Sequence, residues 1–226
     1  WQISDVTTAI GVMFLILALF APFGGALMLR LGITKVAVTS CTLIILGLIL
    51  TVNATQTWHL YFSIGVCLGI ASGILGLGLA ATVATRWFET RRGLVVGILT
   101  SAFAAGQLAF VPITAWLTTR FEWQFSILPI LIGACLCAVL FFLFGKNWPS
   151  DLDVAPYGSD ELFMPPDTSK SNPFLTSISC FLEAIRHPAF WVLAITFFIC
   201  GLTSNGLISQ HFIPFCSDNN LSLIHI

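Results

Sequence analysis

Hydrophobic residues in this chain form long runs without Asp, Glu, Lys or Arg, and short polar gaps separate the runs. A transmembrane helix needs about 20 apolar residues to cross a hydrocarbon core of roughly 30 Å. Because the strands of a membrane barrel alternate between apolar and polar residues, continuously apolar runs predict helices instead. The six predicted transmembrane helices cover residues 6–29, 36–52, 58–85, 93–119, 124–145 and 189–213.

The composition supports a membrane protein. Of the 226 residues, 57% are hydrophobic and 8% are charged, and the mean hydropathy is +0.96. Soluble domains carry about 25% charged residues because their surface faces water. The net charge is −1, whereas a nucleic-acid-binding protein typically carries an excess of basic residues. We therefore predict an all-α, polytopic integral membrane protein that has the lipid bilayer, and no nucleic acid, as a partner.

The basic residues are distributed unevenly among the gaps. Eight of the nine Lys and Arg residues lie in gaps 30–35, 86–92 and 146–188. These gaps alternate along the chain with the gaps at 53–57 and 120–123, which lie on the opposite side of the membrane if every run crosses it. Because cytoplasmic loops are enriched in Lys and Arg, these three gaps are predicted to be cytoplasmic. The membrane we expect is a plasma membrane, or the inner membrane of a bacterium. Trp1 then lies outside, and we expect one further helix upstream of it.

Small residues recur at four-residue spacing in two of the spans. In a bilayer, helices associate through close packing, and such stripes let two backbones approach each other. One stripe consists of Gly65, Gly69 and Gly73, and the other of Gly93, Gly97 and Ser101. We predict that both are helix-packing faces. They are compatible with static packing and with helices that slide or rock.

Four neutral polar residues within the spans are candidates for the substrate pathway: Gln107, Asn205, Gln210 and His211. A polar group at membrane depth needs a hydrogen-bonding partner and is a functional candidate by default. For Gln107 and Asn205, helix–helix bonding and substrate contact remain equal alternatives. All four histidines lie at or beyond span ends, and no nucleophile–base pair or metal-ligand spacing is present in the sequence. We predict no catalytic residue, no metal site, no cofactor and no enzymatic activity.

The gap at 146–188 is longer and richer in proline than the others. It contains six prolines and six acidic residues, which is typical of a linker between two bundles. We predict a first transmembrane bundle over 1–145, a cytoplasmic linker over 146–188 and the first helix of a second bundle over 189–226. Residues 221–226 resemble translated sequencing-adapter sequence, and we expect the native sequence to end near Asn220. The alternative is a genuine outer loop.

Three motifs carry a resemblance to a known family. Residues 25–35 (GALMLRLGITK) resemble the signature loop of the major facilitator superfamily, in which a Gly, an Asp–Arg pair, a second Gly and further basic residues follow one another. The matching positions are Gly25, Arg30, Gly32 and Lys35. Leu29 stands where the family usually has Asp, and Thr34 where it often has a basic residue. The turn at 86–97 and the segment 148–158 are similar to the monocarboxylate-porter and oxalate/formate-antiporter-like branch, with Asp153 replacing a Gly.

The resemblance implies a partial bundle made of family helices two to seven. It also implies a secondary transporter that works by alternating access and moves a small organic solute, a mono- or dicarboxylate, with a coupling proton or counter-substrate. The cytoplasmic gating loops implied by it comprise Gly25, Arg30, Gly32, Lys35, Arg86, Arg91 and Arg92. For the three arginines of the second loop, a role in membrane topology alone remains an equal alternative. An exporter of hydrophobic compounds and a non-transporting sensor of the same fold also remain open.

Overall fold

The fold was analysed in a computed structural model that describes residues 1–159, 172–212, 215–216 and 219. The chain separates into two compact units, Trp1–Ser177 and Ile178–Ile226, and each is described by itself. This division does not test the predicted boundaries of the linker at residues 146 and 188, which stay a prediction.

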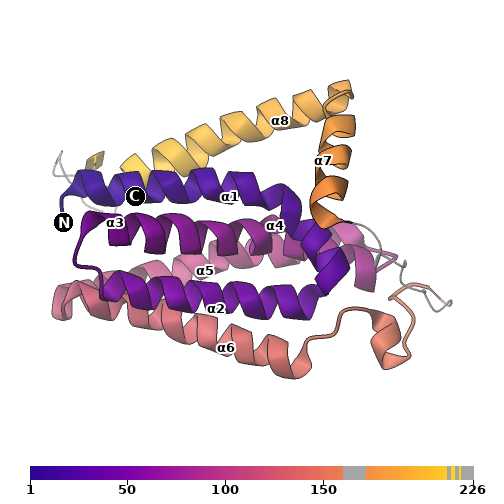
Figure 1. Ribbon diagram of the computed structural model, residues 1–226, viewed down its shortest axis with the longest axis horizontal. Coiled ribbons are helices and arrows are strands. Elements are labelled where there is room, and N and C mark those ends of the chain that lie inside the picture. The colour runs from indigo at the N-terminus through magenta and orange to yellow at the C-terminus, as the bar shows by residue number, and fades with distance from the viewer. Residues whose placement is uncertain (160–171, 213–214, 217–218, 220–226) are drawn as a thin grey trace. The chain divides into compact units, whose positions relative to one another are not determined.

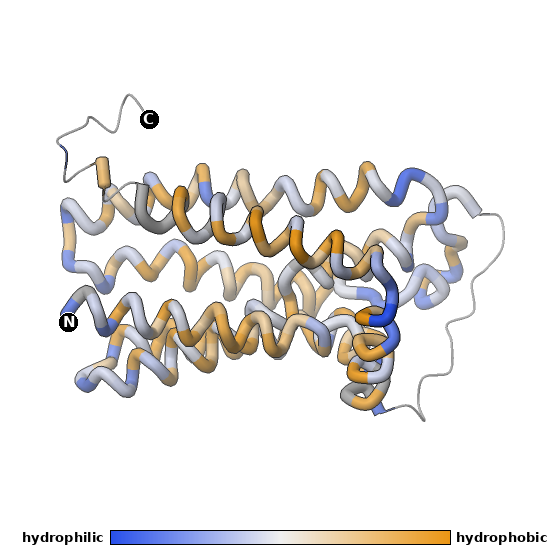
Figure 2. Tube along the Cα trace, turned by 90° about the horizontal axis from the view of Figure 1, so that it is seen from above, coloured by the Kyte–Doolittle hydropathy of each residue, from blue (hydrophilic) through white to orange (hydrophobic). Residues whose placement is uncertain are grey.

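Six helices in the described residues are long and apolar enough to cross a membrane. They cover Ser4–Leu31, Ile33–Val52, Thr57–Trp87, Arg92–Arg120, Trp123–Phe144 and Pro188–Ile208. Each corresponds to one predicted span, so the all-α polytopic fold class is confirmed. The helices begin and end a few residues beyond most predicted limits, because charged residues such as Lys35 and Arg120 are helical although a charge-free run excludes them. Figure 2 shows apolar helix shafts with polar residues concentrated at their ends.

The first unit is built from helices that run back and forth along one direction (Figure 1). Its elements are α1 (Ile3–Leu31), α2 (Ile33–Val52), α3 (Thr57–Leu60), the π-helix η1 (Tyr61–Leu68), α4 (Gly69–Trp87), α5 (Arg92–Arg120), the 3₁₀ helix η2 (Trp123–Ile127), α6 (Leu128–Phe144) and the 3₁₀ helix η3 (Pro149–Leu152). The third span therefore consists of α3, η1 and α4 joined end to end. Helix α7 (Pro173–Ala184) lies within the segment predicted as a linker, and α8 (Pro188–Cys200) with η4 (Gly201–Phe212) forms the last span.

The glycine stripe of the third span lies against α1. A Cβ atom added to Gly65 would lie 2.8 Å from a methyl carbon of Val12, and one added to Gly73 would lie 2.7 Å from the backbone oxygen of Leu17. At Gly69 the nearest atoms, at 3.0 Å, belong to Ile16 and to the Met13 backbone. Any side chain larger than hydrogen at these positions would push the two helices apart. Close backbone approach of this kind is how helices associate in lipid.

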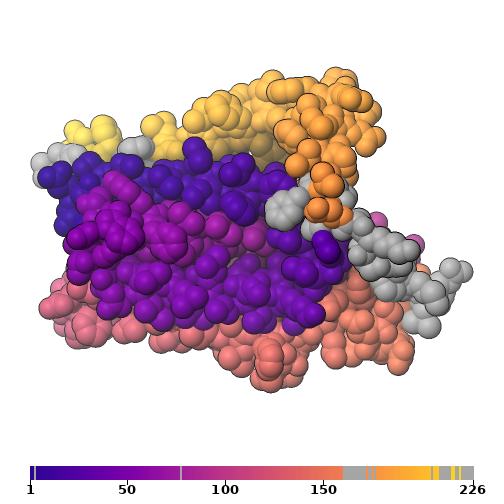
Figure 3. All heavy atoms as spheres, viewed as in Figure 1, coloured from indigo at the N-terminus to yellow at the C-terminus, as the bar shows by residue number. Residues whose placement is uncertain are grey.

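A buried hydrophobic cluster of the first unit lies at the turn between α1 and α2. Met28, Ile33 and Val36 are buried there, from the end of α1 and the start of α2, and Phe141 of α6 packs against them. Farther along α2, the Thr51 hydroxyl donates to the Ser63 hydroxyl of η1 at 3.0 Å, and both side chains are buried. In Figure 3 the surfaces of α1, α2 and the start of the third span meet without a visible gap on the face shown.

None of the residues of helix α5 is buried, and the same holds for α6 after it, whereas α2 contributes eight buried residues. The positions of the second stripe lie on this helix, and Gly93, Gly97 and Ser101 are exposed. A Cβ added to Gly93 or Gly97 would have no atom within 4 Å. The two stripes have the same spacing in the sequence, yet only at the glycines of the first would an added Cβ meet atoms of another helix.

Candidate functional site

The guanidinium of Arg86, at the end of α4, is a charged group enclosed within the first unit. Arg86 is 5% exposed although it is charged. Its Nη2 donates to the Met28 carbonyl at 2.9 Å, its Nη1 donates to the Asn147 carbonyl at 3.2 Å, and its Cζ lies 4.2 Å from the centre of the Trp148 ring. A buried charge is costly unless hydrogen bonds and nearby polarisable groups compensate for it. These three contacts compensate for part of that cost, while Nε is buried with no hydrogen-bond partner among the described residues.

The carbonyl of Met28 belongs to the last turn of α1. The last carbonyls of a helix lack intrahelical donors and form the negative end of its dipole, so they attract a cation. Met28 O also accepts the Gly32 N–H at 3.1 Å, which closes the helix end. Leu29, which stands where the superfamily motif usually has Asp, has no carboxylate that could pair with Arg86. The backbone carbonyl of the preceding residue, Met28, accepts a hydrogen bond from Arg86.

Helix α2 begins at a glycine that has no side chain with which to cap it. The first N–H groups of a helix need acceptors, and an N-cap side chain normally provides one. Gly32, the N-cap residue, adopts φ +89°, which favours glycine, and an added Cβ would collide with the amide of Asn147. Asn147 Oδ1 accepts the Thr34 N–H at 3.2 Å. Asn147 therefore caps α2 from a position 113 residues later in the chain.

Asp151 holds Asn147 and Trp148 in the conformation that this arrangement requires. Its Oδ2 accepts the N–H of Asn147 at 3.0 Å and that of Trp148 at 3.1 Å. The same carboxylate lies in the first turn of η3, where a negative charge is favourable. One carboxylate thus orients both the carbonyl and the ring that contact Arg86.

Residues 145–158, which we call the strap, continue across the turn between α4 and α5. The Tyr157 N–H donates to the Trp87 carbonyl at 2.9 Å, and the Tyr157 carbonyl accepts the Glu89 N–H at 2.9 Å. Phe88 and Tyr157 form an isolated parallel bridge, and their ring centres lie 5.9 Å apart. Gly158, at φ +92°, packs against the side chain of Thr90. The strap therefore joins the α1–α2 turn, the end of α4 and the α4–α5 turn.

Asp153 offers a test of the strap's backbone geometry. It adopts a left-handed conformation, φ 55° and ψ 32°, at the position where the similar branch motif has glycine. Asp153→Val is expected to lower the free energy of unfolding by about 1–2 kcal/mol, because a β-branched residue is strained there. Thermal stability in detergent measures the effect. Asp153→Gly, the matched control, is expected to retain or slightly raise stability, and equal losses in both variants would contradict this account.

The other residues of the predicted gating loops are less enclosed. Arg30, Lys35, Arg91 and Arg92 are exposed, and an added Cβ at Gly25 would meet nothing within 4 Å. Arg92 donates from Nε to the Phe88 carbonyl at 2.6 Å. Of the predicted set, the structure brings Gly32 and Arg86 together around Asn147. A gating role for the remaining members stays a prediction.

The predicted pathway residues are not gathered into one site by the described residues. Gln107 is exposed midway along α5. Asn205, Gln210 and His211 belong to η4, and their side chains lie outside the described residues.

Sequence reasoning assigned no role to Asn147, Trp148, Asp151 or Tyr157, which hold Arg86 and the α4–α5 turn in place. All four fall within the segment 148–158 or directly before it, and that segment was singled out by its resemblance alone. A tryptophan, a proline and an aspartate in sequence after an apolar span were the available signal.

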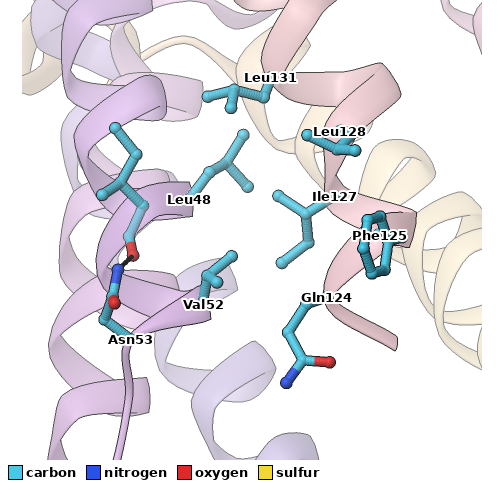
Figure 4. Close-up of a pocket in the computed structure, with 9 residues that line it drawn as sticks. Leu48, Val52, Asn53, Gln124, Phe125, Ile127, Leu128 and Leu131 are labelled. Atoms are coloured by element: carbon cyan, nitrogen blue, oxygen red, sulfur yellow. Dashed lines mark hydrogen bonds between the residues drawn. The ribbon is translucent and has the colours of Figure 1, made fainter. Parts of the chain in front are cut away.

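At the opposite end of α2 the first unit contains a pocket of about 290 Å³. Its walls are formed by the last turn of α2, by η2 and by the start of α6 (Figure 4). The lining is almost entirely aliphatic, with the amides of Asn53 and Gln124 as its polar members. Gln124 Oε1 is buried and has no hydrogen-bond partner in the described part of the chain. Leaving such a group unpaired costs about 1–3 kcal/mol.

The six apolar spans, the close α1–α4 packing and the polar strap at one end of the bundle define a polytopic membrane protein of the helical-bundle class. The family model of the Major Facilitator Superfamily matches residues 1–224, and the chain belongs to this superfamily.

Several curated proteins are similar to the chain. The uncharacterized MFS-type transporter YhjX of Escherichia coli (strain K12) is 29% identical over 197 residues, which cover 86% of this chain and 44% of that protein. Monocarboxylate transporter 13 of Rattus norvegicus is 36% identical over 108 residues, covering 48% of this chain and 25% of that protein. Monocarboxylate transporter 12 of Homo sapiens is 30% identical over 97 residues, covering 42% and 19%. The chain thus spans less than half the length of these relatives.

Proposed function

We propose that the whole protein is a secondary active transporter that moves a small organic mono- or dicarboxylate by alternating access. The observation that carries the proposal is the superfamily match along 1–224, together with relatives whose names include monocarboxylate transporters 12 and 13. In such a mechanism two helical bundles rock against each other around a central site. The solute is accompanied by a coupling proton or a counter-substrate.

The first unit supplies features that suit one of two rocking bundles. A bundle that moves as a body needs its helix ends tied together, and the strap with Arg86 ties the ends of α1, α4 and α6 to the start of α2. We place this end in the cytoplasm, following the distribution of Lys and Arg. The exposed face of α5 with Gly93, Gly97 and Ser101 is the face we propose for contact with the rest of the protein.

For the substrate pathway we retain Gln107, Asn205, Gln210 and His211. Amide and imidazole N–H groups donate to a carboxylate, and such charge-assisted bonds are about twice as strong as neutral ones. All nine Lys and Arg residues lie outside the six apolar runs of the sequence. We therefore propose that the cation facing the carboxylate comes from outside these six runs.

The test is uptake of labelled mono- and dicarboxylates by the complete protein in proteoliposomes, under a pH gradient or a counter-substrate gradient. Gln107→Leu is expected to lower the initial rate about tenfold, since it removes a hydrogen bond to a charged group. Leu99→Ala serves as the control, because Leu99 is 40% exposed and lies on the side of α5 opposite to Gly93, Gly97 and Ser101. Absence of uptake of any organic acid under both gradients would overturn the proposal.

A second candidate, an exporter of hydrophobic compounds, is favoured by one observation: the six apolar runs contain no charged residue. Extrusion of a hydrophobic dye from intact cells, without carboxylate uptake, would identify this activity. Ligand-dependent binding of a partner protein with no flux of either kind would identify a sensor of the same fold.

A further inference from the structure

The pocket between α2 and α6 has no part in the proposed transport. It lies at the end of α2 opposite to the strap, since Leu48 and Val52 form one wall and the strap contacts Gly32 and Thr34. The other wall is formed by Ile127, Leu128 and Leu131. A volume of about 290 Å³ is at the lower limit of small-molecule sites in proteins.

We propose that this pocket binds one acyl chain of a phospholipid from the outer leaflet, and that the headgroup hydrogen-bonds to Gln124. Both walls belong to helices long and apolar enough to span the membrane. Leu48, at 7% exposed, forms the floor, while Val52 at 36% and Leu128 at 43% form an open rim. A pocket with this lining, opening from two spanning helices, takes an apolar chain from the surrounding bilayer.

The polar rim accounts for the headgroup. Asn53 caps α2, and one of its two amide N–H groups donates to the Ile49 carbonyl at 2.8 Å, which holds the side chain against its own helix. Gln124 lies at the end of the pocket (Figure 4), and its Oε1 is buried with no partner in the described residues. Once the amide turns towards the pocket, Oε1 can accept a hydrogen bond from a headgroup N–H. A phosphatidylethanolamine ammonium carries such donors, whereas a choline headgroup carries none.

The depth of the pocket agrees with this assignment. It is formed where one span ends at Val52 and another begins at Trp123. Trp123 is 41% exposed and Trp58, after the end of α2, is 59% exposed. Exposed tryptophans at span ends mark the boundary between hydrocarbon and headgroups. A headgroup at Gln124 with its acyl chain directed towards Leu131 follows from this boundary.

The experiment uses the complete protein in nanodiscs that contain phosphatidylethanolamine with a diazirine on one acyl chain, a few carbons from its ester group. After irradiation, adducts are expected mainly on peptides containing residues 48–53 and 124–131. Val52→Trp fills the pocket and is expected to lower the adduct yield at least fivefold. Leu136→Trp, at an exposed α6 position that does not line the pocket, is the matched control and is expected to leave the yield unchanged.

Headgroup recognition is tested separately. The same diazirine chain on phosphatidylcholine is expected to give about one third of the yield, and Gln124→Leu is expected to abolish this preference. If Val52→Trp does not fold, the smaller substitution Leu128→Phe takes its place. Adducts spread evenly over the spans, or an unchanged yield in a folded pocket-filling variant, would overturn the proposal and point to another segment of the protein in the pocket. The readout is independent of transport, so it fails or succeeds apart from the proposed function.

Discussion

Replacing Arg86 with alanine is expected to lower the free energy of unfolding by about 3–5 kcal/mol. The variant loses two hydrogen bonds from a charged donor, each contributing about 1.5–3 kcal/mol, and a cation–π contact. It also removes the Arg86 donor from the Asn147 carbonyl, and it leaves the Met28 carbonyl with the Gly32 N–H alone. Thermal stability of the complete protein in detergent measures the effect, and a fall of roughly 10 °C is expected.

Two further variants separate the geometry of Arg86 from its charge. Arg86→Lys keeps the charge but replaces a planar fork by a single ammonium, so about half of the loss is expected. Arg92→Ala removes an exposed arginine six residues away in the same loop and is expected to cost about 0.5 kcal/mol or less. If Arg86→Ala and Arg92→Ala destabilise equally, the loop arginines act only through their net charge, and the strap is not what holds Arg86.

The second large effect is expected at the contact between α1 and α4. Gly73→Ala places a Cβ 2.7 Å from the Leu17 carbonyl oxygen and 3.1 Å from its Cα, and both are backbone atoms that cannot rotate away. The two helices must separate locally, and overpacking of this kind costs about 1–3 kcal/mol. Gly73→Leu is expected to prevent the two spans from packing altogether. Resistance to heat and to proteolysis in detergent measures the change.

The matched control for this contact is Gly11→Ala, on the same pair of helices. An added Cβ at Gly11 meets no atom within 4 Å, so alanine is expected to stabilise the helix by about 0.5–1 kcal/mol. Opposite signs for the same substitution at Gly11 and Gly73 are therefore the expected result. A loss at Gly11 as large as that at Gly73 would show that helix propensity, rather than close approach, controls both positions.

The spans were predictable because a charge inside the hydrocarbon core is costly. Runs without Asp, Glu, Lys and Arg can be found directly in the sequence. The ends were less accurate, since Lys35 and Arg120 lie within helices while their charges reach past the hydrocarbon. Sequence patterns also did not show the π-helix at Tyr61–Leu68 or the interruption of α4 at Gly76. Both depend on backbone hydrogen bonding and on packing against neighbours, which no single residue type specifies.

The candidate site was predictable only in part. A stripe of glycines indicates that some helix comes close, yet the spacing is the same for Gly69, which lies against α1, and for Gly97, where an added Cβ would meet no atom within 4 Å. Arg86 was marked by its charge, but its acceptors are backbone carbonyls, and every residue has one. Asn147 caps α2 through a hydrogen bond to Thr34, 113 residues away in the sequence. This hydrogen bond depends on the tertiary contact between the α1–α2 turn and the start of the strap.

Alternating access itself can be tested by counterflow in proteoliposomes that hold the complete protein without an ion gradient. Vesicles loaded with an unlabelled carboxylate are diluted into the same labelled acid at low concentration. A carrier that exposes its site to one side at a time exchanges the two, so transient accumulation of label several-fold above the level in unloaded vesicles is expected. Equal label in loaded and unloaded vesicles, for every mono- and dicarboxylate that the protein binds, would contradict the proposed mechanism.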